Sequence, residues 1–91
     1  MLLGRYAVTR ELGSGAFARV LLANDTERDG MPVAIKVAGG ELDESIRWEF
    51  SLLSSIAHPN VARVYELVRV PEAMPVLGLV RGQLLLVSEL A

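Results

Sequence analysis

The stretch ELGSGAFARV, residues 11–20, decides how the rest of the chain is interpreted. Two glycines, Gly13 and Gly15, flank a serine, and an aromatic and a β-branched residue follow at Phe17 and Val20. Glycine leaves backbone N–H groups uncovered, so such a loop can surround phosphate oxygens. It can equally be a tight turn between two strands, because glycine-rich turns are common. The elements around the loop must decide between these interpretations.

Alternation of apolar and polar residues on both sides of the loop predicts β-strands. The five predicted strands are residues 5–12, 18–25, 31–39, 61–70 and 83–91. Asp29-Gly30 is a strong turn signal between the second and third of them. The connection over residues 71–82 is apolar and long for a hairpin. Short turns between the first three strands favour antiparallel neighbours.

The period of the apolar residues changes to that of a helix after Asp43. The helical repeat over residues 43–57 is Ile46, Phe50, Leu53 and Ala57. Asp43 or Ser45 can cap the N-terminus. HPN at residues 58–60 ends the helix, because a residue before proline avoids helical geometry. The large apolar residues expected in the core or at an interface are Trp48, Phe50, Leu52 and Leu53. We therefore expect an α+β fold, a five-stranded antiparallel sheet with one packed helix.

Composition excludes several classes of protein. Hydrophobic residues make up 52% of the 91 residues, more than so small a domain normally covers, so we expect a partner surface or a missing second half. The net charge of −2 gives no nucleic-acid or membrane-surface footprint. Without cysteine there is no disulfide framework and no thiolate metal site. Apolar runs too short for a signal peptide or a membrane span predict a cytoplasmic protein.

Lys36 is the only lysine among nine basic residues, so its position calls for an explanation. In the third predicted strand, Ala34 and Lys36 lie on the same face because side chains alternate. Ala34 is small enough to admit a flat base opposite Val20, and Lys36 can reach α- and β-phosphates. A lysine held extended needs a counter-charge, which Glu49 on the predicted helix can supply.

In this order and spacing, the motifs resemble the N-terminal lobe of the eukaryotic-type protein kinases. They are LGSGAFARV from Leu12, VAIK ending at Lys36, Glu49 nine residues before HPN, and LLVSELA at the end. The opening residues are most similar to bacterial serine/threonine kinases of this type. The resemblance covers essentially residues 1–91 and implies an ATP-binding small lobe, truncated at the hinge.

The resemblance also implies roles for individual residues. Lys36 and Glu49 are the expected catalytic residues, paired when the helix is swung in. Ser88 occupies the gatekeeper position, and Leu53 and Val64 belong to a hydrophobic spine. Ala18 stands where the third glycine of the loop usually lies. The residues expected to bind ATP are Leu12, Gly13, Ser14, Gly15, Ala16, Phe17, Ala18, Arg19, Val20, Ala34, Lys36, Glu89 (carbonyl) and Ala91 (N–H).

Phosphoryl transfer in this family also needs an aspartate base and magnesium ligands in H-R-D and D-F-G segments. The three aspartates, Asp25, Asp29 and Asp43, lie in predicted turns or at the helix start. We therefore expect no metal ligand in this chain, Mg²⁺ ligands in a large lobe, and no activity from the 91 residues alone. The expected function is the ATP-binding lobe of a serine/threonine kinase, which transfers the γ-phosphoryl of ATP to protein hydroxyls when joined to that lobe.

The sequence also suggests two other interpretations. The chain could be a non-catalytic, truncated kinase-like module that binds nucleotide or a partner protein. A dinucleotide-binding fold is also suggested, because residues 13–18 nearly fit G-x-G-x-x-G/A. That fingerprint must open a helix, and the segment after the loop ends at Asn24-Asp25, too soon for one. His58 is expected to be a structural residue of the turn after the helix.

Overall fold

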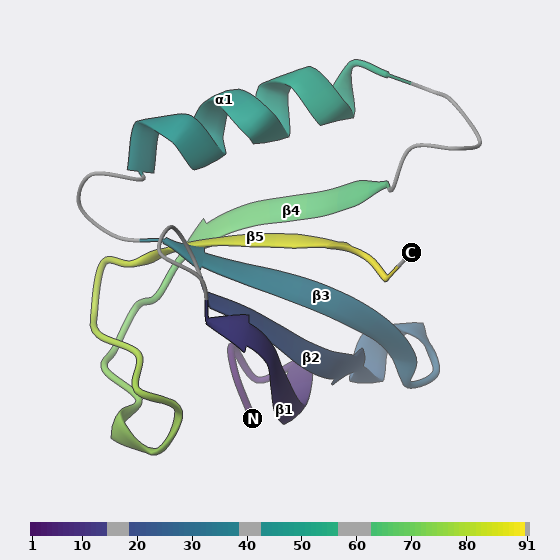
Figure 1. Cartoon of the computed structure of the whole chain (residues 1–91). Coiled ribbons are helices and arrows are strands. Elements are labelled where there is room, and N and C mark those ends of the chain that lie inside the picture. Colours follow the sequence, from purple (N-terminus) through teal and green to yellow (C-terminus); the bar gives the residue numbers. More distant parts are fainter. Residues whose placement is uncertain (15–18, 39–42, 57–62, 91) are drawn as a thin grey trace.

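The computed structural model describes residues 1–14, 19–38, 43–56 and 63–90. Its strands and single α-helix are β1 (Tyr6–Ser14), β2 (Arg19–Asp25), β3 (Met31–Ala38), α1 (Asp43–Ser54), β4 (Val64–Arg69) and β5 (Leu84–Glu89). The strands form one sheet in the order β1-β2-β3-β5-β4, and every neighbouring pair is antiparallel (Figure 1). The α+β prediction, with a five-stranded antiparallel sheet and one helix, is confirmed.

Two layers cover the sheet on opposite sides. Helix α1 lies over one side, and the connection between β4 and β5 folds away from it (Figure 1). The larger buried cluster is Leu2, Tyr6, Leu21, Ala23, Val33, Ile35, Val37, Val70, Leu79, Leu85 and Val87. The smaller cluster, under the helix, is Ala38, Ile46, Leu84 and Leu86. The helix is thus held to the sheet by far less apolar burial than the strands are to the opposite layer.

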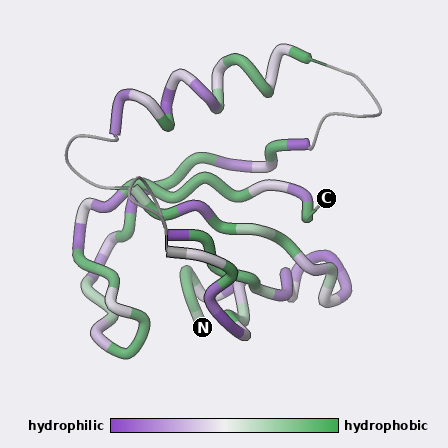
Figure 2. The backbone as a smooth tube through the Cα atoms, viewed as in Figure 1, coloured by the Kyte–Doolittle hydropathy of each residue, from purple (hydrophilic) through white to green (hydrophobic). Residues whose placement is uncertain are grey.

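Strand β3 shows how the sequence separates these two sides. Val33, Ile35 and Val37 are buried in the larger cluster, whereas Ala34 and Lys36 between them are half-buried. Since successive side chains of a strand point to opposite faces, Ala34 and Lys36 face the helix side. Figure 2 shows that polar and apolar residues are interleaved along α1, whereas the central strands have longer apolar runs.

The helix ends earlier than its apolar repeat predicts. Its last residue is Ser54, although the repeat continued to residue 57. Ser55 and Ile56 continue the chain with bonds to carbonyls only three residues back, at 3.3 Å each. The Ser54 and Ser55 hydroxyls bond to the carbonyls of residues 51 and 52, at 3.2 and 2.8 Å, which competes with helical bonding. Ala57 and the predicted HPN turn with His58 lie outside the described residues.

The helix buries only one of the apolar residues expected to pack. Ile46 is 3% exposed, whereas Trp48 is 67% and Leu52 is 43% exposed. Trp48 and Leu52 therefore do not lie in the core, and the interface that the sequence offered as the alternative stays a prediction for both. Phe50 and Leu53 are half-buried, and Phe50 packs against the smaller cluster.

The connection between β4 and β5 is more ordered than its sequence predicts. A 3-10 turn, η3 (Pro75–Leu77), is closed by an antiparallel bridge between Met74 and Leu79. The Met74 N–H donates to the Leu79 carbonyl at 2.9 Å, and the Leu79 N–H donates back at 3.1 Å. Because Val70 and Leu79 are buried in the larger cluster, the connection is part of the fold rather than a free loop.

The N-terminal residues also form structure that the sequence did not reveal. Leu2 and Tyr6 form a bridge across a tight turn in which Leu3 and Gly4 have φ values of 56° and 64°. Leu2 is buried under the sheet as a result. No helix within the described parts of the chain is long and apolar enough to span a membrane.

Candidate functional site

The side of the sheet under α1 collects the residues that sequence reasoning grouped around Lys36. Val20 on β2 pairs directly with Lys36 on β3, and Ala34 pairs with Leu22 on β2 and Ser88 on β5. Val20 and Ala34 thus share a face as predicted, but they are diagonal neighbours and not opposite one another. Together these residues form a small apolar platform beside a single cation.

Lys36 contacts the helix through Glu49. The Lys36 Nζ lies 2.8 Å from Glu49 Oε2 and 3.1 Å from Oε1. Glu49 lies three residues after the buried Ile46, so the two share the face of α1 directed at the sheet. The side chains of Lys36 and Glu49 remain 35% and 36% exposed, so the ion pair is not enclosed by the described residues.

The glycine-rich segment lies at the end of the β1–β2 hairpin. Gly13 pairs with Val20 and Ser14 with Arg19, so the two strands stay paired up to the loop, although their register shifts between Glu11 and Gly13. A side-chain carbon built on Gly13 would meet nothing within 4 Å, and its φ is not positive. Neither packing nor backbone conformation therefore demands glycine there. The expected contacts of residues 15–18 lie outside the described part of the chain.

Arg19 belongs to the predicted nucleotide set, but its side chain is directed elsewhere. It follows the alternation of β2, in which Val20 shares the face of Lys36 and its neighbours take the other face. The Arg19 guanidinium contacts Glu11 on β1 and the Gly78 carbonyl in the β4–β5 connection. The structure therefore does not bring the Arg19 side chain together with Lys36.

The end of β5 carries the residues expected at the adenine edge. Ser88 pairs with Ala34 on one side and Val64 on the other. Glu89 is exposed, and its N–H donates to the Arg63 carbonyl at 2.7 Å. Ala91 lies outside the described residues.

The structure also describes Leu53 and Val64, the two expected spine residues, and Leu12, the first residue of the loop motif. Val64 is half-buried against the smaller cluster, and Leu53 is half-buried on α1. Leu12 is 39% exposed on β1. None of these positions conflicts with the site built around Lys36.

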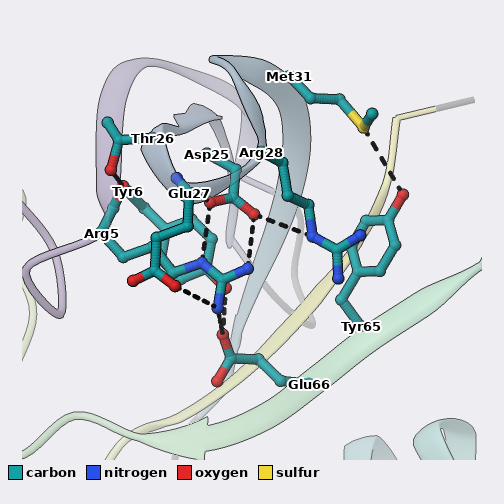
Figure 3. A network of polar contacts seen from close by, with 9 residues as sticks. All are labelled: Arg5, Tyr6, Asp25, Thr26, Glu27, Arg28, Met31, Tyr65 and Glu66. Carbon is teal, nitrogen blue, oxygen red and sulfur yellow. Dashed lines mark hydrogen bonds and ion pairs between the residues drawn. The ribbon is translucent and has the colours of Figure 1, made fainter.

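A second polar cluster was missed by sequence reasoning, which placed Asp25 in a turn. Asp25 is 0% exposed at the end of β2 and accepts bonds from Arg5 Nε at 2.8 Å and Nη2 at 2.9 Å (Figure 3). It also caps η1 (Thr26–Arg28) by accepting from the Glu27 N–H at 3.0 Å. The bond from Arg5 holds the pKa of Asp25 below its ordinary value. An aspartate followed by Thr-Glu at a strand end was the available signal.

The same cluster extends to β4 (Figure 3). The Tyr6 hydroxyl donates to Glu66, and burial is the main cause that raises the pKa of Tyr6. Arg28 stacks over the Tyr65 ring at 4.2 Å from its centroid. Because the cluster ties together β1, β2 and β4 beneath the sheet, away from Lys36, we assign it a structural role.

The described residues contain no group of three or more His, Asp or Glu side chains that could hold a metal ion. Asp43, at the start of α1, is bonded to Arg69 on β4 at 2.8 and 2.9 Å instead. Hydrogen bonding from Arg69 lowers the pKa of Asp43.

Comparison with known proteins gives a consistent result. A family model described as protein tyrosine and serine/threonine kinase matches residues 6–87. CBL-interacting protein kinase 32 of Oryza sativa subsp. japonica is 44% identical over 71 residues, which cover 71% of this chain and 16% of the relative. CBL-interacting serine/threonine-protein kinase 3 of Arabidopsis thaliana is 39% identical over 71 residues, with the same coverage of 71% and 16%.

A third relative, CBL-interacting protein kinase 19 of Oryza sativa subsp. japonica, is 39% identical over 89 residues, or 90% of this chain and 17% of the relative. The chain thus spans about a sixth of the length of these relatives. All three are plant proteins, so the expected similarity to bacterial kinases in particular is not supported.

Proposed function

Because the chain belongs to the protein tyrosine and serine/threonine kinase family, we propose that its sheet face under α1 binds ATP. The protein that carries this lobe would transfer the γ-phosphoryl group to serine or threonine hydroxyls of other proteins. Residues 1–91 would supply the nucleotide half of that site, and a large lobe the base and the Mg²⁺ ligands. Since ATP is the proposed ligand, we propose the cytoplasm, where ATP is abundant, as its location.

The observation that carries this proposal is the Lys36–Glu49 ion pair. A lone cation on a strand would swing freely in water, whereas Glu49 holds the ammonium, with Nζ 2.8 Å from Oε2. The two carboxylate oxygens take two of the three N–H donors of the ammonium, which leaves one for another acceptor. Because 35% of the Lys36 side chain is exposed, that donor can meet a phosphate oxygen. Lys36 is the proposed α- and β-phosphate ligand, and Glu49 orients it.

The remaining described residues fit the other parts of a nucleotide. Val20 and Ala34 offer a flat, small-residue surface on the same face as Lys36 for the adenine ring. The open space over Gly13 leaves its backbone uncovered at the base of the loop, as close approach to phosphate requires. Residues 15–18 and Ala91 lie outside the described residues and remain proposed contacts on the strength of the sequence pattern alone.

The chemistry that these residues can perform is positioning and charge neutralisation. Bound ATP would supply the phosphoryl group to be transferred. Lys36 would fix the α- and β-phosphates and neutralise part of their charge, and the apolar platform would fix the base. Such preorganised electrostatic contacts typically account for a large share of an enzyme's rate enhancement. Removal of one donor lowers the rate about 10²–10³-fold.

The test is Lys36→Met in the natural full-length protein. We expect phosphoryl transfer from ATP to a protein substrate such as casein to fall about a hundredfold or more, with a smaller change in ATP affinity. Arg81→Met is the matched control, because Arg81 is exposed on the β4–β5 connection and carries the same charge. Wild-type turnover by Lys36→Met would refute the assignment. Binding of ATP without any transfer by the wild type would favour the non-catalytic alternative.

A further inference from the structure

Arg19 joins three parts of the molecule behind the proposed ATP site. Its Nε lies 2.9 Å and its Nη2 2.7 Å from Glu11 Oε1 on β1. Its Nη1 donates to the Gly78 carbonyl at 3.2 Å. Arg19 is the first residue of β2 and pairs with Ser14, the last residue of β1. One guanidinium therefore bridges both strands at the base of the glycine loop to the β4–β5 connection.

The far end of this bridge is fixed to the fold. Gly78 follows η3 as its C-cap, and its N–H donates to the Pro75 carbonyl at 3.0 Å. The next residue, Leu79, is 1% exposed in the larger core cluster. The Gly78 carbonyl is thus held by a closed turn on one side and a buried side chain on the other. It gives Arg19 an acceptor that lies outside the β1–β2 hairpin and next to a residue of the core.

We infer that Arg19 is a positioning residue that fixes the paired end of the β1–β2 hairpin, Gly13 and Ser14, and so sets how the Gly13 backbone meets the phosphates of a nucleotide. The guanidinium acts from the face opposite Lys36, so it touches no ligand itself. The guanidinium is planar and carries N–H donors on several edges, so it can bind two acceptors at once. Two such contacts fix the orientation of the hairpin end relative to the rest of the fold. The inference rests on the proposed function and adds a residue and a segment, the β4–β5 connection, to its machinery.

The fit around Gly78 is an independent observation in its favour. A side-chain carbon at Gly78 would lie 3.2 Å from Arg19 Nη1, tighter than nine in ten real contacts, so the guanidinium would have to shift by a few tenths of an ångström. The φ of +66° there also disfavours any other residue. Gly4 has a similar φ of +64°, yet nothing lies within 4 Å of a carbon built on it. Gly78 and Gly4 thus share the backbone constraint and differ in the contact with Arg19.

The experiment measures the affinities of the natural full-length protein for ATP and for adenosine, which lacks phosphates. In Arg19→Met we expect ATP affinity to fall about three- to fivefold, as the loss of a partly exposed charged pair implies, and adenosine affinity to stay the same. An equal change for both ligands, or no change for either, would overturn the inference while leaving ATP binding intact. If the wild type bound neither ligand, the proposed function would fail as well.

Gly78→Ala separates positioning from direct contact with phosphate, because it displaces the guanidinium without altering Arg19. We expect the same selective loss of ATP affinity, smaller than in Arg19→Met, while Gly4→Ala leaves both affinities at the wild-type level. This pair also keeps the test open if Arg19→Met does not fold. Equal ATP affinity in Gly78→Ala and Gly4→Ala would contradict the bridge.

Discussion

Asp25 shows how much one buried charge can depend on its partners. It is the one charged residue that is fully buried among those described, and Arg5, Arg28 and the Glu27 N–H surround its carboxylate. Removing a charge from such a site leaves the donors without their acceptor, which is more damaging than the net contribution of the bonds. The residue that sequence reasoning left in a turn is therefore a strong candidate for a stability determinant.

We expect Asp25→Asn to lower the free energy of unfolding by about 1–3 kcal/mol, because an amide cannot accept both guanidinium bonds as an anion does. Chemical denaturation followed by circular dichroism measures the change. Asp29→Asn is the matched control: Asp29 is exposed and has a φ of 57°, a conformation that asparagine tolerates well. A loss as large in Asp29→Asn would show that the buried cluster is not responsible.

The depressed pKa of Asp25 has a defined consequence for pH dependence. An unfolded aspartate titrates near 3.8, and in the folded chain the bond from Arg5 lowers that pKa. The stabilisation is therefore fully present above the unfolded pKa and is lost as the pH falls through the folded one. We expect Asp25→Asn to unfold with a weaker acid dependence below about pH 4 than the wild type. Identical acid dependences would contradict this assignment.

At the scale of the element, α1 is the least anchored part of the fold. Its 12 residues bury one side chain, Ile46, and a helix of that length is marginal in water without packing. Two polar links, from Glu49 to Lys36 and from Asp43 to Arg69, complete its attachment. Because one of those links is the proposed phosphate-orienting pair, helix docking and site assembly are coupled.

Ile46→Ala is expected to release the helix while leaving the sheet folded. Removing most of a buried isoleucine destabilises its contacts by about 2 kcal/mol or more. Amide hydrogen exchange should therefore accelerate across residues 43–54 and remain slow in β3 and β5. Leu52→Ala, at a position 43% exposed on the same helix, should change neither. Uniform acceleration throughout the chain would mean that α1 unfolds only together with the sheet.

At the scale of the whole molecule, the chain is compact but leaves large apolar side chains exposed. The Cα radius of gyration of 12.5 Å is close to the value of about 12 Å for a compact chain of this length. Yet several large apolar side chains remain outside, including Trp48 at 67% and Val76 at 97% exposure. Compactness comes from the larger core cluster, and the outer side of α1 stays uncovered within the described chain.

Trp48 reports on that outer side, since it is the only tryptophan. In the monomeric 91-residue chain we expect red-shifted emission and efficient quenching by iodide, as its 67% exposure implies. The concentration dependence of the emission serves as the internal control, because self-association would cover the helix. Blue-shifted, iodide-resistant emission at the lowest concentration would contradict the exposed position.

The sequence by itself determined the strands, the helix and the shared face of Val20, Ala34 and Lys36. These depend on local period and turn chemistry, so residues close in the chain decide them. It also located Glu49 correctly, because helical spacing relates it to Ile46 within one turn. The sequence did not reveal the diagonal offset between Val20 and Ala34, because the register depends on how the two strands pair.

Only the tertiary structure decided which side of each element is covered. Arg19 and Gly78 are 59 residues apart in the sequence, and Tyr6 and Glu66 are 60 residues apart. Nothing in the local sequence pattern indicates that either pair is in contact. The exposure of Trp48 and the burial of Asp25 likewise depend on where distant segments fold. The hydrophobic effect is non-directional. It therefore predicts that an apolar residue tends to be buried, but not which distant segment buries it.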